Sequence, residues 1–560
     1  MNMRHFFLLL FALVFAGSDS LAQGDQSGKD RVVGLWLMGQ SLCEGAQSLP
    51  IVTGADTGRG NLAFKRGVRT WIYGKHADKP EDRPDEPFAF VPLTAAVYGG
   101  LGETIANGLA DHLTAGEKSR FLVSYAGQGG RMIDELSEVD QSTDPRTPKS
   151  RQHGGGYYRT SLDDARRASK QANAIGVDFS IAALVWMQGE ANGGPTGGIN
   201  PSRWDTELPR PAGQEWYRDR LIAYREKWSR DLQAITGKSG ELPLFTYQTL
   251  GPAGEAQLMA ADKDPNITMV GPHYMVASGI NSRYAKRYGA AIHLSADGER
   301  WYGEQVAKVI RRVLTEREKW QPLRPAKAQI ADDRNSVLVD FQVPRPPLVL
   351  DQEFLSLQQY KMDDGYSSLC GFRVSDAAGG IALISSVEVE SPTTIRIHFT
   401  SDLKTDKKYR ISYGLPYSGQ IGKITGIRSG PVVDDQATTE LLIEGDLSGK
   451  LKHLIDEGTF HVTNMNTAGN YTQAPVRQVR VEDGSTVLRF ENRELRQGGE
   501  FLVGQMLTAL RPFSYGNLRD SDPEKAIYRF ADKTYGRRAG ESYPLWNWCV
   551  LFSGFSISEK

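Results

Sequence analysis

The chain has 560 residues, roughly three to four times the length of an ordinary domain, so we expect more than one domain. Hydrophobic residues make up 40% of it and charged residues 24%, which is the composition of a folded globular protein. The formal net charge of −1 argues against nucleic acid or an anionic membrane surface as a partner, because both require a basic face.

The N-terminus has the pattern of an export signal. Arg4 and His5 precede the apolar run Phe6–Ala16, and small residues end at Ala22. The apolar run is shorter than the roughly 20 residues that cross a bilayer as a helix. The sequence therefore predicts a signal peptide over residues 1–22 and an exported protein, periplasmic or extracellular, with no integral membrane span after cleavage.

Residues 30–318 alternate apolar strands with amphipathic helices. The predicted strands begin at Val32, Phe121, Ser180, Pro243 and Ile267. They are continuous apolar runs, as in strands that are covered on both faces. Helical spacing is seen in Leu101–Leu113, in Tyr217–Ile235 and, after a predicted N-cap at Ser295, in Trp301–Val313. The alternation predicts an α/β domain with a parallel sheet, helices on both faces and a ligand site at the carboxyl ends of the strands.

After residue 318 the pattern changes to short alternating runs that are separated by Gly, Pro and Asp. This pattern is typical of an antiparallel β-sandwich. We expect one sandwich module over residues 326–430. Residues 431–560 are either a second β-rich module or a continuation of the first.

Four segments at predicted strand ends or before a helix carry polar side chains: GQS (39–41), YAGQGGRMIDEL (from 125), WMQGEAN (186–192) and AAIHLSADG (from 290). Together they supply a hydroxyl, glycine N–H groups, a side-chain amide and an imidazole. Acyl transfer requires such a set, because it needs a nucleophile, a base for its proton and donors for the oxyanion.

The four blocks, in this order, resemble those of SGNH (GDSL-like) hydrolases, and within them the sialate O-acetylesterase-type carbohydrate esterases. The resemblance covers about residues 31–314 and implies an SGNH-hydrolase-like (flavodoxin-like) fold. It implies Ser41 as nucleophile, His293 as general base, and an oxyanion hole of the Ser41 N–H, Gly130 (or Gly129) and the Gln188 side chain. We expect Gln40, Arg131 and Asn192 to contact the substrate.

Two positions depart from the family pattern. Many SGNH enzymes have an aspartate three residues before the histidine, where this chain has Ala290, and the asparagine that usually follows the serine is Leu42. Glu190 is a candidate for the missing carboxylate, approaching His293 from the neighbouring strand. Asp297 is a poorer one, because we expect it to face outward in the first turn of a helix.

The cysteines give little further direction. A bridge between Cys370 and Cys549 would suit an exported protein, which leaves Cys43 as the odd thiol, but the sequence leaves this pairing open. No Cys and His cluster has zinc-site spacing, and we expect neither a metal nor a cofactor.

The blocks predict a serine esterase that removes acetyl, or another small acyl group, from an acylated glycan or sugar. The alternative is a carbohydrate-binding protein on an inactive hydrolase scaffold, which the departures at Ala290 and Leu42 favour. A cell-surface adhesin that uses the β region is a third class, and nothing in the α/β half supports it.

Overall fold

The computed structural model describes residues 30–53, 56–70, 88–94, 102–116, 119–137, 156–193, 213–276, 293–352, 360–361, 367–377, 380–414, 417–449, 451, 461–465, 471–492, 501–511, 516–531 and 539–559. The predicted signal peptide and Ala290 lie outside these residues. Among the helices that these ranges contain, none has both the length and the apolarity needed to cross a membrane.

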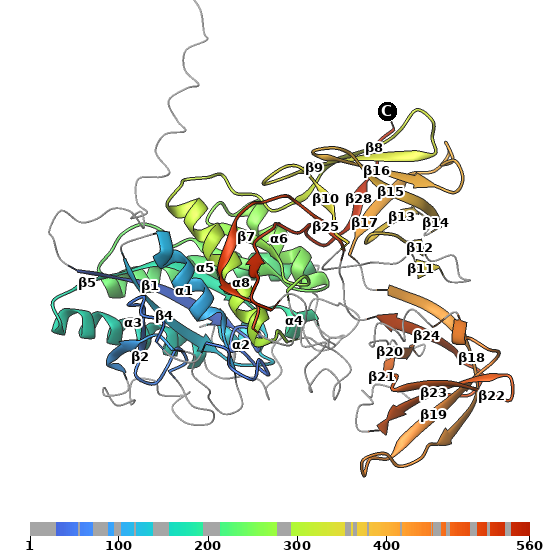
Figure 1. Cartoon of the computed structure of the whole chain (residues 1–560), viewed down its shortest axis with the longest axis horizontal. Coiled ribbons are helices and arrows are strands. Elements are labelled where there is room, and N and C mark those ends of the chain that lie inside the picture. Colours follow the sequence, from blue (N-terminus) through green and yellow to red (C-terminus); the bar gives the residue numbers. More distant parts are fainter. Residues whose placement is uncertain are drawn as a thin grey trace, which may run out of the picture.

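A seven-stranded sheet with the order β3-β2-β4-β1-β5-β6-β7 forms the centre of the N-terminal half (Figure 1). Its strands are β1 (Arg31–Gly39), β2 (Leu62–Phe64), β3 (Phe90–Pro92), β4 (Arg120–Gly127), β5 (Asp178–Met187), β6 (Leu244–Gln248) and β7 (Ile267–Pro272). The five predicted strands are confirmed and pair in parallel. Taken alone they have the doubly wound order 2-1-3-4-5, in which the direction of the strand order reverses beside β1 while all five strands stay parallel.

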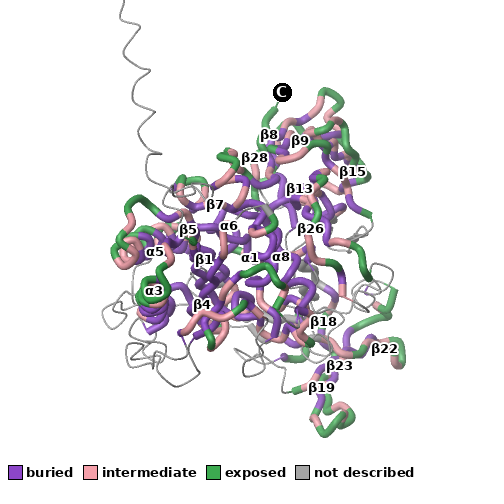
Figure 2. Tube along the Cα trace, turned by 60° about the vertical axis from the view of Figure 1, so that its left-hand side comes forward, coloured by how far each residue is buried: buried purple, intermediate pink, exposed green. Residues whose placement is uncertain are grey.

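Helices cover both faces of the sheet, as predicted. They are α1 (Ile105–Gly116), α2 (Ile133–Leu136), α3 (Gly156–Ala174), α4 (Glu190–Gly193), α5 (Gly213–Thr236), α6 (Pro252–Lys263) and α8 (Ala296–Leu314). Alternate residues of β1 serve the two faces: Leu35 and its neighbours pack with α1 and α8, and Trp36 and its neighbours pack with α3, α5 and α6. The strands are accordingly buried, whereas the outer faces of α3 and α5 reach solvent (Figure 2).

Helix α8 matters for the site because His293 lies just before it. Ser295 is its N-cap, as predicted, and its hydroxyl accepts a hydrogen bond of 3.1 Å from the Gly298 N–H. The helix lies against α1 with almost no space between the two backbones. A methyl group at Gly108 would lie 2.1 Å from the Arg300 carbonyl oxygen, and one at Gly303 would lie 2.2 Å from the Ile105 carbonyl oxygen. These glycines therefore allow α8 to pack this closely against α1.

The β region begins with two four-stranded antiparallel sheets, β15-β16-β9-β8 and β14-β13-β17-β28. Their inward residues share one core, so the two sheets pack face to face. The strands are β8 (Arg324–Ile330), β9 (Ser336–Gln342), β13 (Phe372–Asp376), β14 (Ile381–Ala382), β15 (Ile384–Ser391), β16 (Thr394–Phe399), β17 (Tyr409–Tyr413) and β28 (Phe552–Ser556). Three short strands lie beside them: β10 (Val349–Leu350), β11 (Tyr360–Lys361) and β12 (Ser367–Ser368).

A second β module, the sheet β21-β20-β24-β18-β19-β23-β22, has its own core. Its strands are β18 (Tyr417–Ser429), β19 (Thr438–Ile443), β20 (His461–Met465), β21 (Tyr471–Pro475), β22 (Gln478–Glu482), β23 (Ser485–Glu491) and β24 (Met506–Arg511). The break that we expected at residue 430 falls just after β18, which belongs wholly to this module. The chain therefore passes from the sandwich to the second module between residues 413 and 417.

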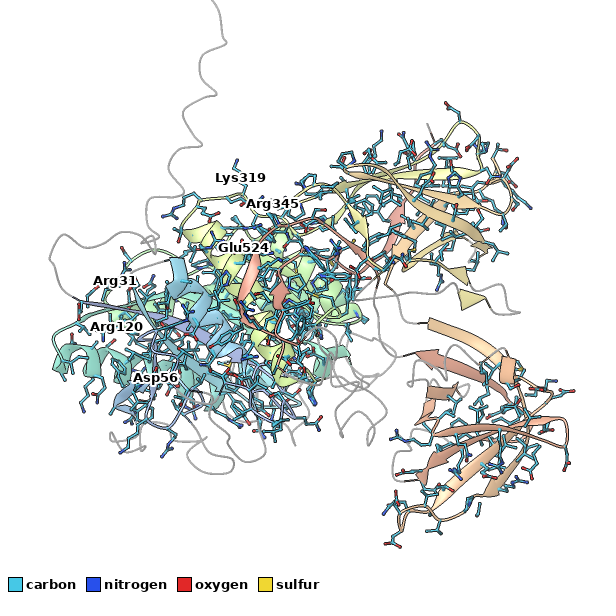
Figure 3. All side chains as sticks on the ribbon, in the orientation of Figure 1. Arg31, Asp56, Arg120, Lys319, Arg345 and Glu524 are labelled. Atoms are coloured by element: carbon cyan, nitrogen blue, oxygen red, sulfur yellow. The ribbon has the colours of Figure 1, made fainter. Side chains whose placement is uncertain are left out.

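The segment after the second module returns to the α/β domain (Figure 1). Its strands are β25 (Leu518–Arg519), β26 (Lys525–Arg529) and β27 (Ser542–Pro544). Lys308 of α8 makes a fully buried ion pair of 3.1 Å with Asp522, and Glu524 lies over the same helix (Figure 3). The chain then ends in the first sandwich through β28. Residues 431–560 are thus neither one module nor a simple continuation.

All three cysteines are buried free thiols, and the bridge considered for Cys370 and Cys549 does not form. Both residues belong to the core of the first sandwich. They therefore stabilise the sandwich as small apolar side chains and not as a covalent link.

Candidate active site

Ser41 lies in the turn directly after β1, at the carboxyl edge of the sheet and beside the point where the strand order reverses. The Gln40 N–H donates to the Met187 carbonyl at 2.9 Å, and the Ala46 N–H donates to the Ser41 carbonyl at 2.9 Å, so the turn is held at both ends. Ser41 is partly exposed. Among the described residues its hydroxyl has no hydrogen-bond partner, and none joins it to His293.

The second block approaches Ser41 closely. A methyl group at Gly129 would lie 3.4 Å from the Ser41 Cβ and 2.9 Å from Glu44 Oε1, so this glycine faces the serine turn. Gly130 has a φ of +73°, a conformation that favours glycine. Helix α2 then begins, and Glu135 Oε2 accepts a 2.7 Å hydrogen bond from the Met132 N–H. The backbone at Gly129 and Gly130 is therefore accessible to a ligand, and the hydrogen bond from the Met132 N–H to Glu135 stabilises the segment that follows.

The third block is tied to the first two through buried amides. Gln40 Oε1 accepts from the N–H groups of Gly189 (3.3 Å) and Ala191 (3.1 Å). Gln188 Nε2 lies 2.7 Å from Asn192 Oδ1, 3.0 Å from the Arg131 carbonyl and 3.3 Å from Gln40 Oε1. Gln188 is fully buried, and its two N–H bonds are already used, so in this state it braces the blocks against one another.

Of the three residues that we expected to contact substrate, only Arg131 reaches the surface. Gln40 and Asn192 are buried, and Asn192 Oδ1 also accepts from the Ile133 N–H at 2.9 Å. The Arg131 guanidinium lies 3.1 Å from Glu135 Oε1 and 5.9 Å from the centre of the Tyr157 ring. Arg131 therefore lies at the protein surface, next to Gly129 and Gly130.

His293 is held from the serine turn itself. Its Nδ1 lies 2.8 Å from Gln47 Oε1, an acceptor, so Nδ1 carries the proton and Nε2 is left as the base. Burial lowers the pKa of His293 below its ordinary value, and the negative charge of Glu190 opposes that change. The imidazole is therefore neutral near pH 7, as a general base must be.

Glu190 faces the same region but makes no hydrogen bond to His293. Its Oε1 accepts hydrogen bonds from the hydroxyls of Tyr247 and, at 2.5 Å, Thr249. Its Oε2 is buried and has no hydrogen-bond partner in the described part of the chain. The carboxylate thus acts on the imidazole as a nearby charge, and its geometry is set by the end of β6.

His273, which follows β7, is a residue that the sequence patterns did not single out. It is buried against the Tyr247 ring, with 5.1 Å between ring centres, and its Nδ1 lies 3.3 Å from the Gln248 carbonyl. Burial lowers its pKa, again opposed by Glu190. His273, Tyr247 and Thr249 all lie at predicted strand ends, so the strand-end rule that selected the other blocks could have found them.

Buried carboxyl groups lie near the serine turn. Burial raises the pKa of Glu299 well above its ordinary value, and the charge of Glu103 adds to the effect. Both Glu299 oxygens are buried without a hydrogen-bond partner among the residues that are described. Burial likewise raises the pKa of the Cys43 thiol, and the charges of Glu299 and Glu44 contribute. Cys43, two residues after Ser41, is therefore a protonated core thiol and not a second nucleophile.

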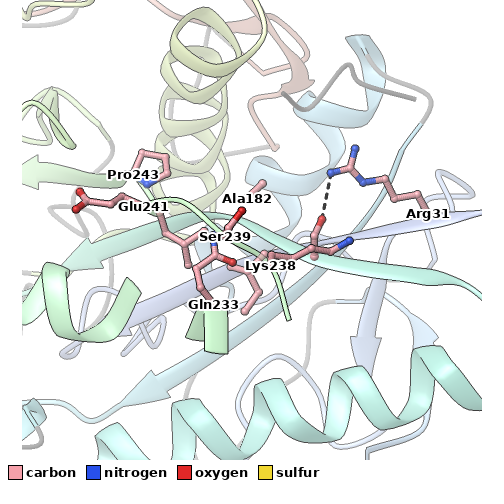
Figure 4. Close-up of a pocket in the computed structure, with 10 residues that line it drawn as sticks. Arg31, Ala182, Gln233, Lys238, Ser239, Glu241 and Pro243 are labelled. Atoms are coloured by element: carbon pink, nitrogen blue, oxygen red, sulfur yellow. Dashed lines mark hydrogen bonds between the residues drawn. The ribbon is translucent and has the colours of Figure 1, made fainter. Parts of the chain in front are cut away.

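A small pocket opens elsewhere, where β5 and β6 begin, between residues such as Arg31, Lys238 and Glu241 (Figure 4). The Arg31 guanidinium donates to the Ser180 hydroxyl there at 3.1 Å. Because parallel strands run in one direction, this pocket lies at the edge of the sheet opposite to Ser41. No group of His, Cys, Asp and Glu able to hold a metal ion is present among the described residues.

No protein-family model and no curated protein matches this chain. Among solved structures, a carbohydrate acetylesterase from Xanthomonas citri (XAC1771) is similar at 14% identity and a TM-score of 0.43, over 68% of this chain and 75% of that one. NanS is similar at 15% identity and a TM-score of 0.35, over 51% and 99% of the two chains. Est24, a carbohydrate acetylesterase from Sinorhizobium meliloti, is similar at 12% identity and a TM-score of 0.25, over 50% and 99%. At these values the likeness carries no argument about activity, which has to come from the site.

Proposed function

We propose that this protein is an exported serine esterase that removes acetyl, or another small acyl group, from a carbohydrate through an acyl-Ser41 intermediate. The observation that carries the proposal is the serine turn itself. It presents a partly exposed hydroxyl that bonds to none of the described residues, at the edge of the sheet where ligands bind, and through Gln47 it holds the Nδ1 of His293. The turn that carries Ser41 therefore also bonds to His293, which supports the roles of nucleophile and base for these two residues.

In the first half-reaction, Ser41 Oγ attacks the acyl carbon while His293 Nε2 takes the hydroxyl proton. The carbonyl oxygen becomes an oxyanion, for which the N–H groups of Ser41 and of Gly130 or Gly129 are the proposed donors. His293 then gives its proton to the alkoxide oxygen of the leaving sugar, and the acyl group stays on Ser41. The ester bond to the sugar is broken and the ester bond to Ser41 is formed.

In the second half-reaction, water replaces the sugar. His293 takes a proton from water, the resulting hydroxide attacks the acyl carbon, and Ser41 Oγ leaves and recovers the proton. Gln188 is the third proposed donor to the oxyanion. Because both of its N–H bonds are used in the present state, this role requires one of them to turn from the Arg131 or Gln40 oxygen toward the substrate.

The sugar part of the proposal rests on the resemblance of the four sequence blocks to carbohydrate esterases. Arg131 supports it, because its partly exposed guanidinium lies beside the two glycines and can donate hydrogen bonds to sugar hydroxyls. Export rests on the sequence pattern of residues 1–22.

The test is hydrolysis of an aryl acetate by the mature protein and by its Ser41→Ala and His293→Gln variants. We expect turnover by the wild type, and a loss of at least about 10³-fold in either variant. Acetylated glycans are then compared by the release of acetate. Turnover that survives Ser41→Ala would contradict the proposal.

The alternative function is sugar binding without turnover, and one observation favours it. The partner of His293 Nδ1 is a neutral amide, where serine hydrolases commonly use a carboxylate. If the wild type hydrolyses neither the aryl acetate nor acetylated glycans, yet binds a glycan measurably by calorimetry, the binding function is correct.

A further inference from the structure

The residue that bonds to His293 Nδ1 has an unusual backbone conformation. Gln47 has a φ of +67°, in the left-handed region that side chains other than glycine rarely adopt. Such conformations persist only where the surrounding structure holds them, and they concentrate at functional sites. Here the conformation places the Gln47 side chain so that Oε1 lies 2.8 Å from His293 Nδ1, although 246 positions separate the two residues in the chain.

Glu190, the carboxylate that the sequence suggested for this task, is committed elsewhere. Its Oε1 accepts from both Tyr247 and Thr249, which lie at the end of β6. Glu190 is the charged group that acts on His293 among the described residues, and it does so without a hydrogen bond. Orientation and charge, which one aspartate supplies together in a serine-protease triad, are therefore divided between two residues.

We propose that Gln47 is the positioning residue of the catalytic base. It fixes the Nδ1–H tautomer and the ring orientation of His293, while Glu190 supplies the negative charge that stabilises the imidazolium. This inference rests on the proposed function, because it assigns Gln47 a part in the same acyl transfer. An amide can do this work because its carbonyl oxygen accepts the Nδ1–H bond as a carboxylate would, without bringing a second negative charge into the site.

Three variants of Gln47 separate positioning from folding. Gln47→Met keeps the length of the side chain and removes the acceptor. Gln47→Gly removes the side chain, but it suits the positive φ, so its melting temperature should equal or exceed that of the wild type. Gln47→Glu keeps the acceptor and adds a charge. The matched control is Gln305→Met, which removes a buried glutamine amide 3.2 Å from Asn547, on α8 and away from the site.

We expect Gln47→Met and Gln47→Gly to lower kcat for the aryl acetate by about 10²-fold or more, because the base loses its orientation. KM should stay unchanged, because the substrate keeps its contacts. Gln47→Glu should retain turnover and move the acidic limb of the kcat/KM profile to higher pH, by about one unit, because a carboxylate next to the imidazole favours its protonated form. Gln305→Met should match the wild type in kcat and in its pH profile.

A second measurement does not depend on turnover. In protein labelled with ¹⁵N-histidine, and with the His293 signals assigned through His293→Gln, the Nδ1 of His293 should be the protonated nitrogen in the wild type. In Gln47→Met the two tautomers should be mixed. Wild-type kcat and an unchanged tautomer in Gln47→Met would overturn the inference while leaving the esterase in place. An inactive wild type would instead refute the proposed function, and the tautomer result would still decide whether Gln47 orients His293.

Discussion

Replacing Gln248 by methionine should detach the C-terminal segment from the end of β6. The Gln248 side chain is fully buried. Its amide makes two hydrogen bonds to the backbone of a single residue of that segment, Leu551. Its Nε2 donates to the Leu551 carbonyl at 2.8 Å, and its Oε1 accepts from the Leu551 N–H at 2.6 Å. Methionine has nearly the same shape and can make neither bond.

The expected cost follows from what is left behind. Leu551 is itself buried, so the substitution strands one N–H and one carbonyl away from water. Each buried polar group without a partner costs about 1–3 kcal/mol, so the local opening of this contact should become easier by about 2–6 kcal/mol. Since about 1.4 kcal/mol corresponds to a factor of ten, amide exchange at Leu551 should accelerate by roughly 30-fold or more.

Hydrogen exchange followed by mass spectrometry is the appropriate assay, because it reports the local opening at Leu551 itself. Peptides that contain Leu551 should exchange faster in Gln248→Met and stay near the wild-type rate in Gln305→Met. Because Gln248 lies between Tyr247 and Thr249, which hold Glu190, kcat should fall as well. Wild-type exchange at Leu551 in Gln248→Met would refute the reasoning.

Three further predictions concern pH. Glu190 raises the pKa of His293 against the lowering effect of burial, so Glu190→Gln should move the acidic limb of the kcat/KM profile to lower pH and reduce kcat. Burial raises the pKa of Glu299, so its neutral form favours folding fully below the ordinary value near 4.5, and that contribution is lost as pH rises through the folded value. Glu299→Gln should therefore raise the urea midpoint at pH 8 more than at pH 4, and equal gains at both would contradict the assignment. Burial lowers the pKa of His112, but hydrogen bonds to Glu304 and Glu524 outweigh it and raise the pKa, so His112→Gln should lower the melting temperature more at pH 6 than at pH 9.

The strands of the central sheet could be predicted because each is a continuous apolar run, and strand–helix alternation allows few topologies for them. The helices that were found have a clear apolar stripe, as in α8. The helix α3 was not singled out, because aspartates and arginines interrupt its apolar positions. In the structure those charges pair with one another: Arg167 Nε lies 2.7 Å from Asp163 Oδ2.

The β region was harder because its topology depends on contacts between distant residues. β18 pairs with β24 through its first half and with β19 through its second half, so a boundary at residue 430 looked acceptable from the local pattern. Likewise, nothing near residues 552–556 indicates that β28 pairs with β17.

The same limit applied at the site. Ser41, Gly130 (or Gly129), Gln188 and His293 could be proposed from the sequence because each follows a predicted strand or precedes a helix. Gln47 was not, because its role depends on a positive φ and on a partner far along the chain.

The central claim is that Ser41 is a nucleophile activated by His293. The most direct measurement is the intact mass of the mature protein after exposure to a fluorophosphonate, followed by peptide mapping. We expect one phosphonyl adduct, on Ser41, absent from Ser41→Ala and formed far more slowly in His293→Gln. An unmodified wild type, or an adduct that persists in Ser41→Ala, would contradict it.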